Sequence, residues 1–409
     1  MGKIIVNDLS IQKNKIICKL EVSSELNKVF REKEFWVEYF EDIGNIEYSI
    51  AIIPLLANIA PIAWFTNSDI IIESIDANFY DSLNELKSVF SEMYNISSNS
   101  NIIFRKKLLN NYNGICDATF FSGGIDSLST FISKKESIKY LVTLWGADIE
   151  ISDTNGWKKV SSELKSFSKK NNLKNIFLKS NLRKFINEAE LNNKFKYLIK
   201  NGWWPNVQHS LGMAGLLAPI AYKHNIRYLF VPSSYTKDFN KPWGSDPKID
   251  NKIKFCGLHC YHEGYELSRQ NKIKNISKYI NENDKNLFIR VCWEKDGGGN
   301  CCLCEKCCRT IVGLALEDIN YKNNGFDTSK NFFKYVKFML ENSQWVFSDD
   351  EIFMWNDIRR NIDERIYNYD DERRIFFEWL KSIDINNIYL NQTKFKNRVM
   401  RKLRKFKYK

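Results

Sequence analysis

The sequence predicts an α/β protein with a doubly wound parallel sheet. From Asn113 onward, short apolar runs alternate with helical stretches, which is typical of parallel sheets with crossover helices. The β-prone run 116–121 also leads through a Ser-Gly-Gly turn directly into a helical pattern. We expect four segments: an N-terminal α+β domain (1–112), a βαβ domain (113–290), a cysteine-rich module (291–325) and a C-terminal helical region (326–409).

The expected elements follow from apolar periodicity and turn residues. In the first segment we expect strands at 4–6, 16–20, 35–39 and 70–74, and helices at 52–65 and 79–94. This segment carries no recognisable chemistry, so we interpret it as a scaffold or lid. In the second segment we expect strands at 116–121, 140–145, 175–178 and 228–231, separated by helices at 127–135, 157–171 and 208–224. In the C-terminal region we expect helices at 311–317, 332–341, 349–363 and 373–383, with a capping box from Ser348 to Glu351.

Composition and charge limit the class of protein. The 409 residues are 44% hydrophobic and 14% aromatic, which is enough for two or three well-packed domains. No apolar run is long enough to span a membrane, and the N-terminus lacks the apolar core of a signal peptide, so we expect a cytoplasmic protein.

The net charge of +12 is unevenly distributed. Residues 394–409 hold nine basic and no acidic residues, which leaves about +3 for the body by subtraction. We therefore expect that the body does not bind nucleic acid. The tail could form a basic amphipathic helix for RNA or an anionic membrane, or a disordered solubilising segment.

The turn after the run 116–121 suits a phosphate. A helix N-terminus presents unpaired N–H groups and a positive dipole end, and two adjacent glycines let the backbone approach an anion. The candidate phosphate-binding residues are Ser122, Gly123, Gly124, Ile125, Asp126 and Ser127. Because the Asp126 carboxylate would repel a phosphate, we expect Mg²⁺ between them.

The stretch Ser-Gly-Gly-Ile-Asp-Ser resembles the pyrophosphate loop (PP-loop) of the ATP pyrophosphatase superfamily. The resemblance implies a Rossmann-like PP-loop fold and ATP as substrate. It also implies transfer of AMP to an oxygen with release of pyrophosphate, after which a nucleophile displaces AMP. In this reading Asp126 and Ser127 are catalytic.

Further candidate residues follow the other strands at the expected carboxyl edge of the sheet, where ligands bind in such folds. In the superfamily the turn with Gly146 and Asp148 would hold adenine and ribose, although Asp148 could equally solvate a turn. Side chains that could contact substrate are His209, Ser233, Ser234, Tyr235, Trp243 and Asp246. His209 could instead be a structural histidine, and Trp243 a packed loop tryptophan.

Two cations come later in the chain. We expect His262, Glu266 and Arg269 on one face of a helix, from their spacing. A solvated ion-pair face would explain that spacing as well as a site does. A polyphosphate site needs cations, and we place Arg269 and Lys272 there in catalytic roles.

Four cysteines have the spacing of a metal site. Cys292 is followed by Cys301, Cys304 and Cys307 in a Cys-x2-Cys-x2-Cys run. Four thiolates at short spacings fit a closed tetrahedral zinc site, and an iron–sulfur cluster is the competing interpretation. We expect Cys302 and Cys308 to lie outside the set, because using Cys302 would break the even spacing.

The loop and the cysteine run together resemble 7-cyano-7-deazaguanine synthase, an enzyme of queuosine biosynthesis, and its relatives. Similarity to one branch of the same superfamily covers roughly residues 35–320. It rests on the stretches 232–235, 242–245, 262–269 and 300–310, although Asp246 stands where that branch has a histidine. The resemblance implies ATP, Mg²⁺ and Zn²⁺, a carboxylate substrate, and ammonia or an amine as nucleophile in an amide- or nitrile-forming reaction.

Three classes of function remain open. The protein is expected to be a C–N ligase-like enzyme acting on a small molecule or a protein-terminal carboxylate, working as a homo-oligomer or within a multi-gene system. The alternatives are a tRNA-modifying PP-loop enzyme and a non-catalytic ATP-binding component of a larger system. The basic tail favours the tRNA alternative, whereas the nearly neutral body does not.

Overall fold

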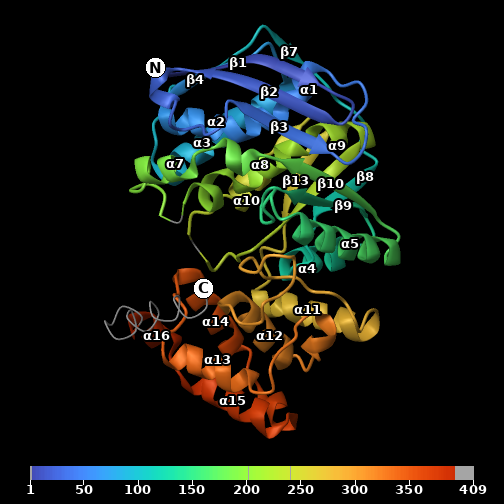
Figure 1. The fold of residues 1–409 in the computed structure, drawn as a ribbon, viewed down its shortest axis with the longest axis vertical. Helices are drawn as coiled ribbons and strands as arrows, with labels where there is room; N and C mark the ends of the chain where they lie inside the picture. The colour runs from blue at the N-terminus through green and yellow to red at the C-terminus, as the bar shows by residue number, and fades with distance from the viewer. Residues whose placement is uncertain (1, 201, 240, 392–409) are drawn as a thin grey trace. The chain divides into compact units, whose positions relative to one another are not determined.

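The computed structural model describes residues 2–200, 202–239 and 241–391 (Figure 1). The chain divides into two units. The sheet unit comprises Met1–Ser122, Ser133–Ser234 and Asn240–Tyr265, and the helical unit comprises Gly123–Ile132, Tyr235–Phe239 and Glu266–Lys409. The basic tail 394–409 lies outside the described residues.

The sheet unit is an α/β structure around one large, mostly parallel sheet. Its strand order is β12-β13-β11-β8-β9-β10-β3-β2-β1-β4-β6. The strands are β1 Gly2–Ile11, β2 Lys15–Val22, β3 Glu34–Tyr39, β4 Ser68–Ile71, β6 Ile102–Ile103, β8 Cys116–Phe120, β9 Ile138–Trp145, β10 Lys174–Ser180, β11 Ile226–Pro232, β12 Lys254–Phe255 and β13 Leu258–Glu263. A separate parallel pair joins β5 Ser74–Asp76 to β7 Lys106–Leu108.

The five central strands β10, β9, β8, β11 and β13 are all parallel. The chain runs outward from β8 through β9 to β10, and then returns to the other side of β8 for β11 and β13. The strand order therefore reverses between β8 and β11. In open α/β sheets, the carboxyl ends of the strands at such a reversal are where ligands bind.

The N-terminal strands join this same sheet. β3 pairs antiparallel with β10, through Tyr39 opposite Leu178, and β2 and β1 follow outward. Residues 1–112, which we expected as a domain of their own, therefore share a unit with the parallel strands. The β3–β10 pairing joins segments about 140 residues apart, and periodicity within either segment carries no sign of it.

A buried helix fills the core of the sheet unit. In α2, Ile53–Thr66, every residue from Ile53 to Phe65 is buried, as expected for a helix that is apolar all round. It packs against α8, His209–Leu216, and against α3, Ala77–Tyr94. Two short helices, α1 Tyr48–Ala51 and α9 Ala218–His224, lie beside each other, as do α8 and α10, Pro247–Asp250.

The helix expected at 208–224 is interrupted. A π-helical turn, Trp204–Gln208, leads into α8, and α9 begins after Leu217. Pro219 stands in the first turn of α9, where its missing N–H does not matter, but it would have broken a continuous helix. The two other crossover helices, α4 Ile125–Lys134 and α5 Thr154–Lys170, agree closely with expectation. The short helices α6 Leu182–Phe185 and α7 Glu188–Lys194 precede the π-helical turn.

The helical unit is formed mainly by the C-terminal part of the chain. It contains most of α4 and the helices α11 Arg269–Glu282, α12 Glu305–Leu316, α13 Phe332–Glu341, α14 Asp349–Arg360, α15 Asp371–Ser382 and α16 Ile385–Asn391. α11 packs on α12 and α14, and α13 packs on α15. The expected capping box between Ser348 and Glu351 begins α14. Among the described helices, none combines the length and the apolar character needed to span a membrane.

Candidate functional site

The Ser-Gly-Gly turn connects β8 to α4. Gly123 has a φ of +75°, a left-handed conformation that glycine adopts without cost. Gly124 accepts hydrogen bonds at its carbonyl from Leu128 N (2.9 Å) and from Ser127 Oγ (3.1 Å). The Arg290 N–H donates to the Gly123 carbonyl at 2.9 Å. The turn is therefore held from several sides at the start of α4.

Asp126, in the first turn of α4, is bound by two buried cations. Arg269 Nη1 lies 3.2 Å from its Oδ2, and Lys272 Nζ lies 3.3 Å from its Oδ1. The side chains of Arg269 and Lys272 are only 7% and 2% exposed, whereas that of Asp126 is 23% exposed. The expected grouping of Asp126, Arg269 and Lys272 is therefore present.

The cations outnumber the carboxylate. Burial by itself would raise the pKa of Asp126, but Lys272, Arg269 and Lys306 outweigh it and lower this pKa below its usual value. Burial lowers the pKa of Lys272, and Asp126 opposes that shift. A buried positive excess next to a helix N-terminus is a favourable place for an anion.

The start of α11 explains the position of both cations. Ser268 caps this helix by accepting a hydrogen bond from the Asn271 N–H, so Arg269 and Lys272 stand in its first turn, three residues apart on one face. Cations are unfavourable at the positive end of a helix dipole. This arrangement strengthens the local positive potential at some cost in stability.

The expectation that His262, Glu266 and Arg269 share one helical face is wrong. His262 lies in β13, Glu266 lies in the turn that follows, and α11 begins only at Arg269. Gly264, with a φ of +82°, turns the chain after the strand. Helical spacing therefore has no meaning across this stretch.

The four expected cysteines come together. The Sγ atoms of Cys292, Cys301, Cys304 and Cys307 all lie within 4.8 Å of one another. The Sγ–Sγ distances are 4.0 Å from Cys292 to Cys304 and 3.9 Å from Cys301 to Cys307. A tetrahedron with zinc–sulfur bonds of about 2.3 Å has edges of about 3.8 Å, so the thiols fit a tetrahedral metal ion.

The neighbouring residues complete the cysteine site. Cys302 and Cys308 are outside the cluster, as expected, and Cys308 Sγ lies 3.5 Å from the Cys302 carbonyl oxygen. The Asn300 side chain, which we did not predict, accepts from the N–H groups of Val291 and Cys292 and donates to Ile289 O. Its signal in the sequence was its position directly before the first cysteine of the Cys-x2-Cys-x2-Cys run.

The turn after β9 is tightly fixed. Gly146 has a φ of +118°, and a Cβ there would lie 2.1 Å from the Ser180 carbonyl oxygen. Only glycine fits this position. Asp148, two residues later, is exposed, so the structure leaves both of its interpretations open.

His209 begins α8 and is mostly enclosed. Its Nδ1 is buried and has no hydrogen-bond partner among the described residues. Burial lowers the pKa of His209, and Asp148 and Asp250 oppose that shift. The ring stands edge-on to Trp204, with centroids 5.2 Å apart. A neutral imidazole at this place could contact a polar ligand.

Backbone hydrogen bonds join the loop with Trp243 to the π-helical turn and to the start of α8. The Gly244 N–H donates to Pro205 O at 2.8 Å, and the Ser210 N–H donates to Gly244 O at 3.2 Å. Asp246 accepts from the Lys248 N–H at 2.8 Å and so caps α10. Asp246 therefore has a structural role in capping α10, which we did not predict from the sequence.

Asp250 and His262 form a buried polar pair next to this loop, which we did not predict from the sequence. Asp250 Oδ2 accepts from Ser245 Oγ at 2.8 Å and lies 2.6 Å from His262 Nδ1. The side chains of Asp250 and His262 are 0% and 1% exposed. The only sign of this pair in the sequence was His262 in a run of alternating apolar residues.

The stretch 233–235 divides between the two units. Ser233 is buried in the sheet unit, where its N–H donates to Glu263 O at 2.9 Å, and Ser234 is half-buried. Tyr235 belongs to the helical unit. Its hydroxyl donates to Asp350 Oδ2 at 3.1 Å, and its ring stacks on Phe239 at 4.4 Å. Within that unit, Tyr235 has a packing role.

Comparisons with protein-family models, with curated proteins and with solved structures found no match to this chain.

Proposed function

We propose that the protein is an ATP-dependent C–N ligase-like enzyme that adenylates a carboxylate, or a similar oxygen, and releases pyrophosphate. The observation that carries the proposal is the group of Asp126, Arg269 and Lys272 at the N-terminus of α4, next to a Gly-Gly turn. The reversal of strand order at β8, directly before this turn, supports it further.

The residues of this group fit a polyphosphate. The N–H groups at the start of α4 and the cations Arg269 and Lys272 would bind phosphate oxygens. In the transfer, the substrate oxygen attacks the α-phosphorus and the bond to the β-phosphate oxygen breaks. The same donors would stabilise the negative charge that develops on the departing pyrophosphate. A nitrogen nucleophile then attacks the activated carbon, and AMP leaves.

Metal ions have two different places in this proposal. Asp126 would be a protein ligand of Mg²⁺, with phosphate oxygens and water as the remaining ligands, as is usual for this ion. Bound Mg²⁺ would neutralise charge on the phosphates. The four cysteines would hold Zn²⁺ in a closed structural site without an open coordination position.

We propose a small or protein-terminal carboxylate as substrate, with ammonia or an amine as the nucleophile. Within the sheet unit taken by itself, His209 and the loop around Trp243 offer an imidazole and an indole, which suit a planar or compact group. The resemblance to deazaguanine synthases points to the same chemistry.

The test measures which products are formed from ATP. We expect the purified protein with Mg²⁺, ammonia and a panel of carboxylates to release pyrophosphate and AMP. Asp126→Asn should lower this turnover by about 100-fold or more, the size of effect seen when one transition-state contact is removed. Asp81→Asn, which breaks the exposed pair with Lys107, is the matched control and should leave turnover unchanged.

Two outcomes would contradict the proposal. Release of orthophosphate without pyrophosphate would show a different bond being broken. Tight ATP binding without turnover under any condition of the panel would instead support a non-catalytic ATP-binding component.

A further inference from the structure

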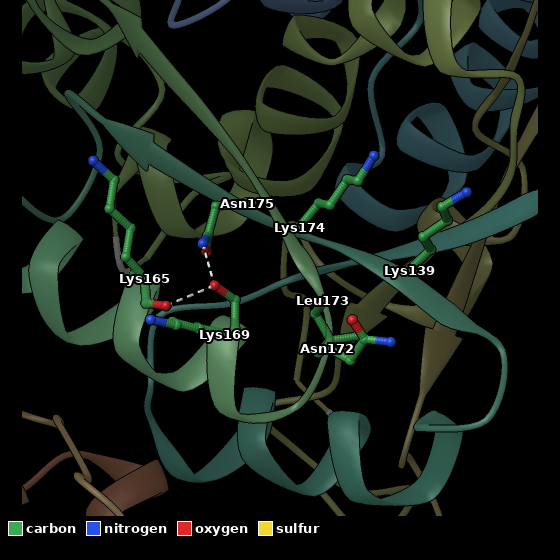
Figure 2. A pocket seen from close by; sticks show the side chains of 8 residues that line it. Lys139, Lys165, Lys169, Asn172, Leu173, Lys174 and Asn175 are labelled. Atoms are coloured by element: carbon green, nitrogen blue, oxygen red, sulfur yellow. Dashed lines mark hydrogen bonds between the residues drawn. The ribbon is translucent and has the colours of Figure 1, made fainter.

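A basic hollow lies at the start of β9 and β10, in the sheet unit (Figure 2). It has a volume of about 520 Å³, and four lysines stand around it: Lys139, Lys165, Lys169 and Lys174. The side chains of Asn172 and Asn175 add polar groups, and none of the described residues that line the hollow is acidic.

The four lysines are exposed, and within the described part of the chain none forms an ion pair with a carboxylate. Figure 2 shows Lys165 and Lys139 on opposite sides of the hollow, with Lys174 between them. The positive charges are therefore spread over a surface instead of meeting at one point.

This surface belongs to a strongly basic segment. From Lys158 to Lys184 the chain holds nine basic residues and one acidic residue, Glu163, for a net charge of +8. Since the body without the tail has a net charge of about +3, the rest of the body is about −5 by subtraction. Because the net charge of the body is close to neutral, that number does not reveal the local excess of positive charge.

The basic residues of α5 also form a row. Lys158, Lys165 and Lys169 are spaced seven and four residues apart, so they lie along one side of the helix. At 1.5 Å per residue, the row is about 16 Å long, which equals roughly five phosphate steps along a duplex.

We propose that the surface formed by Lys139, Lys158, Lys165, Lys169 and Lys174 binds the phosphodiester backbone of a nucleic acid. A row of separated charges that form no ion pairs among the described residues matches a regularly spaced chain of phosphates better than it matches one compact anion. Among the residues described in the lining there is also no large aromatic anchor of the kind that protein interfaces place at their centre, which argues against an acidic protein. With lysines and amides as its donors, the surface would bind without reading the base sequence.

This inference is independent of the proposed function. The hollow lies where β9 and β10 begin, whereas the Gly146 turn follows the end of β9. Eight residues of strand separate these edges by about 26 Å. A nucleic acid on the lysines would therefore contact a different part of the sheet unit from the loops at the carboxyl ends.

The test measures binding of the full chain to a 20-base-pair RNA duplex over a range of salt concentrations. The quadruple variant Lys158→Gln, Lys165→Gln, Lys169→Gln and Lys174→Gln should bind at least 10-fold more weakly at low salt. The slope of log affinity against log salt should fall by about three to four, close to one per lost phosphate contact.

The matched control removes the same charge elsewhere, by Lys13→Gln, Lys28→Gln, Lys33→Gln and Lys248→Gln, which are exposed residues of the sheet unit. Its salt slope should remain that of the wild type. Equal losses of affinity in both variants would mean that binding depends only on net charge or on the basic tail, and would overturn the proposal. It would also be overturned if poly-glutamate of equal length bound as tightly, or if only tripolyphosphate binding responded to the variant. Thermal unfolding of each variant identifies any loss that comes from misfolding.

Discussion

At the scale of single residues, Asp126 is notable because one carboxylate stands between two buried cations. Each cation lies within 3.3 Å of it, and both are nearly inaccessible to water. Removing one member of a buried ion pair leaves the other charge without compensation, which is costly. Asp126 therefore stabilises the fold as well as preparing an anion site.

We expect this stabilisation to depend on pH in the acidic range. The pKa of Asp126 is lowered in the folded state, so its contribution is fully present above the unfolded pKa of about 3.9 and is lost as pH falls through the folded value. Asp126→Asn should lower the free energy of unfolding by about 3 kcal/mol at neutral pH. This difference from the wild type should shrink steadily below about pH 4.

Urea unfolding of both proteins between pH 2.5 and pH 7 measures this. Added pyrophosphate should stabilise Asp126→Asn more than the wild type, because the anion replaces the missing carboxylate between the cations. A pH-independent difference would mean that the variant changes packing and not charge.

At the scale of elements, the turn after β9 depends on one glycine. Gly146→Ala places a Cβ 2.1 Å from the Ser180 carbonyl oxygen at a φ of +118°, so we expect a loss of about 3 kcal/mol of stability. Gly44→Ala is the control, since Gly44 has a φ of +72° with open space around it. It should cost about 1 kcal/mol. Chemical denaturation compares the two, and equal losses would show that the close contact with Ser180 is unimportant.

The cysteine cluster is the second element-scale test. We expect one zinc per chain, bound by Cys292, Cys301, Cys304 and Cys307, and coupled to folding of the segment before α12. Cys307→Ser should lose the metal and lower the melting temperature, whereas Cys308→Ser should keep the metal. Elemental analysis of each variant measures this. A brown protein with iron in the cluster would contradict the zinc assignment.

Elements with a strong local signal were predictable. The strand at Cys116–Phe120, the helix at Phe332–Glu341 and the capping box at Ser348 follow from apolar periodicity and capping residues, and all are present. The placement of His262 was wrong, because spacing alone does not distinguish a strand end from a helix start. The contacts of Asp250 and Asn300 could not be predicted, since they depend on segments brought together only by the fold.

At the scale of the whole molecule, the strands before residue 112 complete the sheet that contains β8. A fragment beginning at residue 113 would expose the edge of β10 and remove α2 from its packing with α8. We expect this fragment to be insoluble, because an unpaired strand edge and an apolar surface both favour aggregation.

Co-expression supplies the control for this prediction. Residues 1–112, expressed as a separate chain, should restore a soluble complex with the fragment 113–409. Circular dichroism and size-exclusion chromatography measure the result. A monomeric, fully folded fragment 113–409 would show that the shared sheet is not required.

During protein synthesis, Asp126 can pair with Arg269 and Lys272 only after the ribosome has translated the residues between them. These partners are 143 and 146 residues apart in the chain. At about 5–20 residues per second, a ribosome needs roughly 7–30 s to translate that interval. A nascent chain halted before Arg269 has the turn and its aspartate but neither buried cation. Truncated translation products would therefore carry the phosphate-loop motif without the charges that complete it.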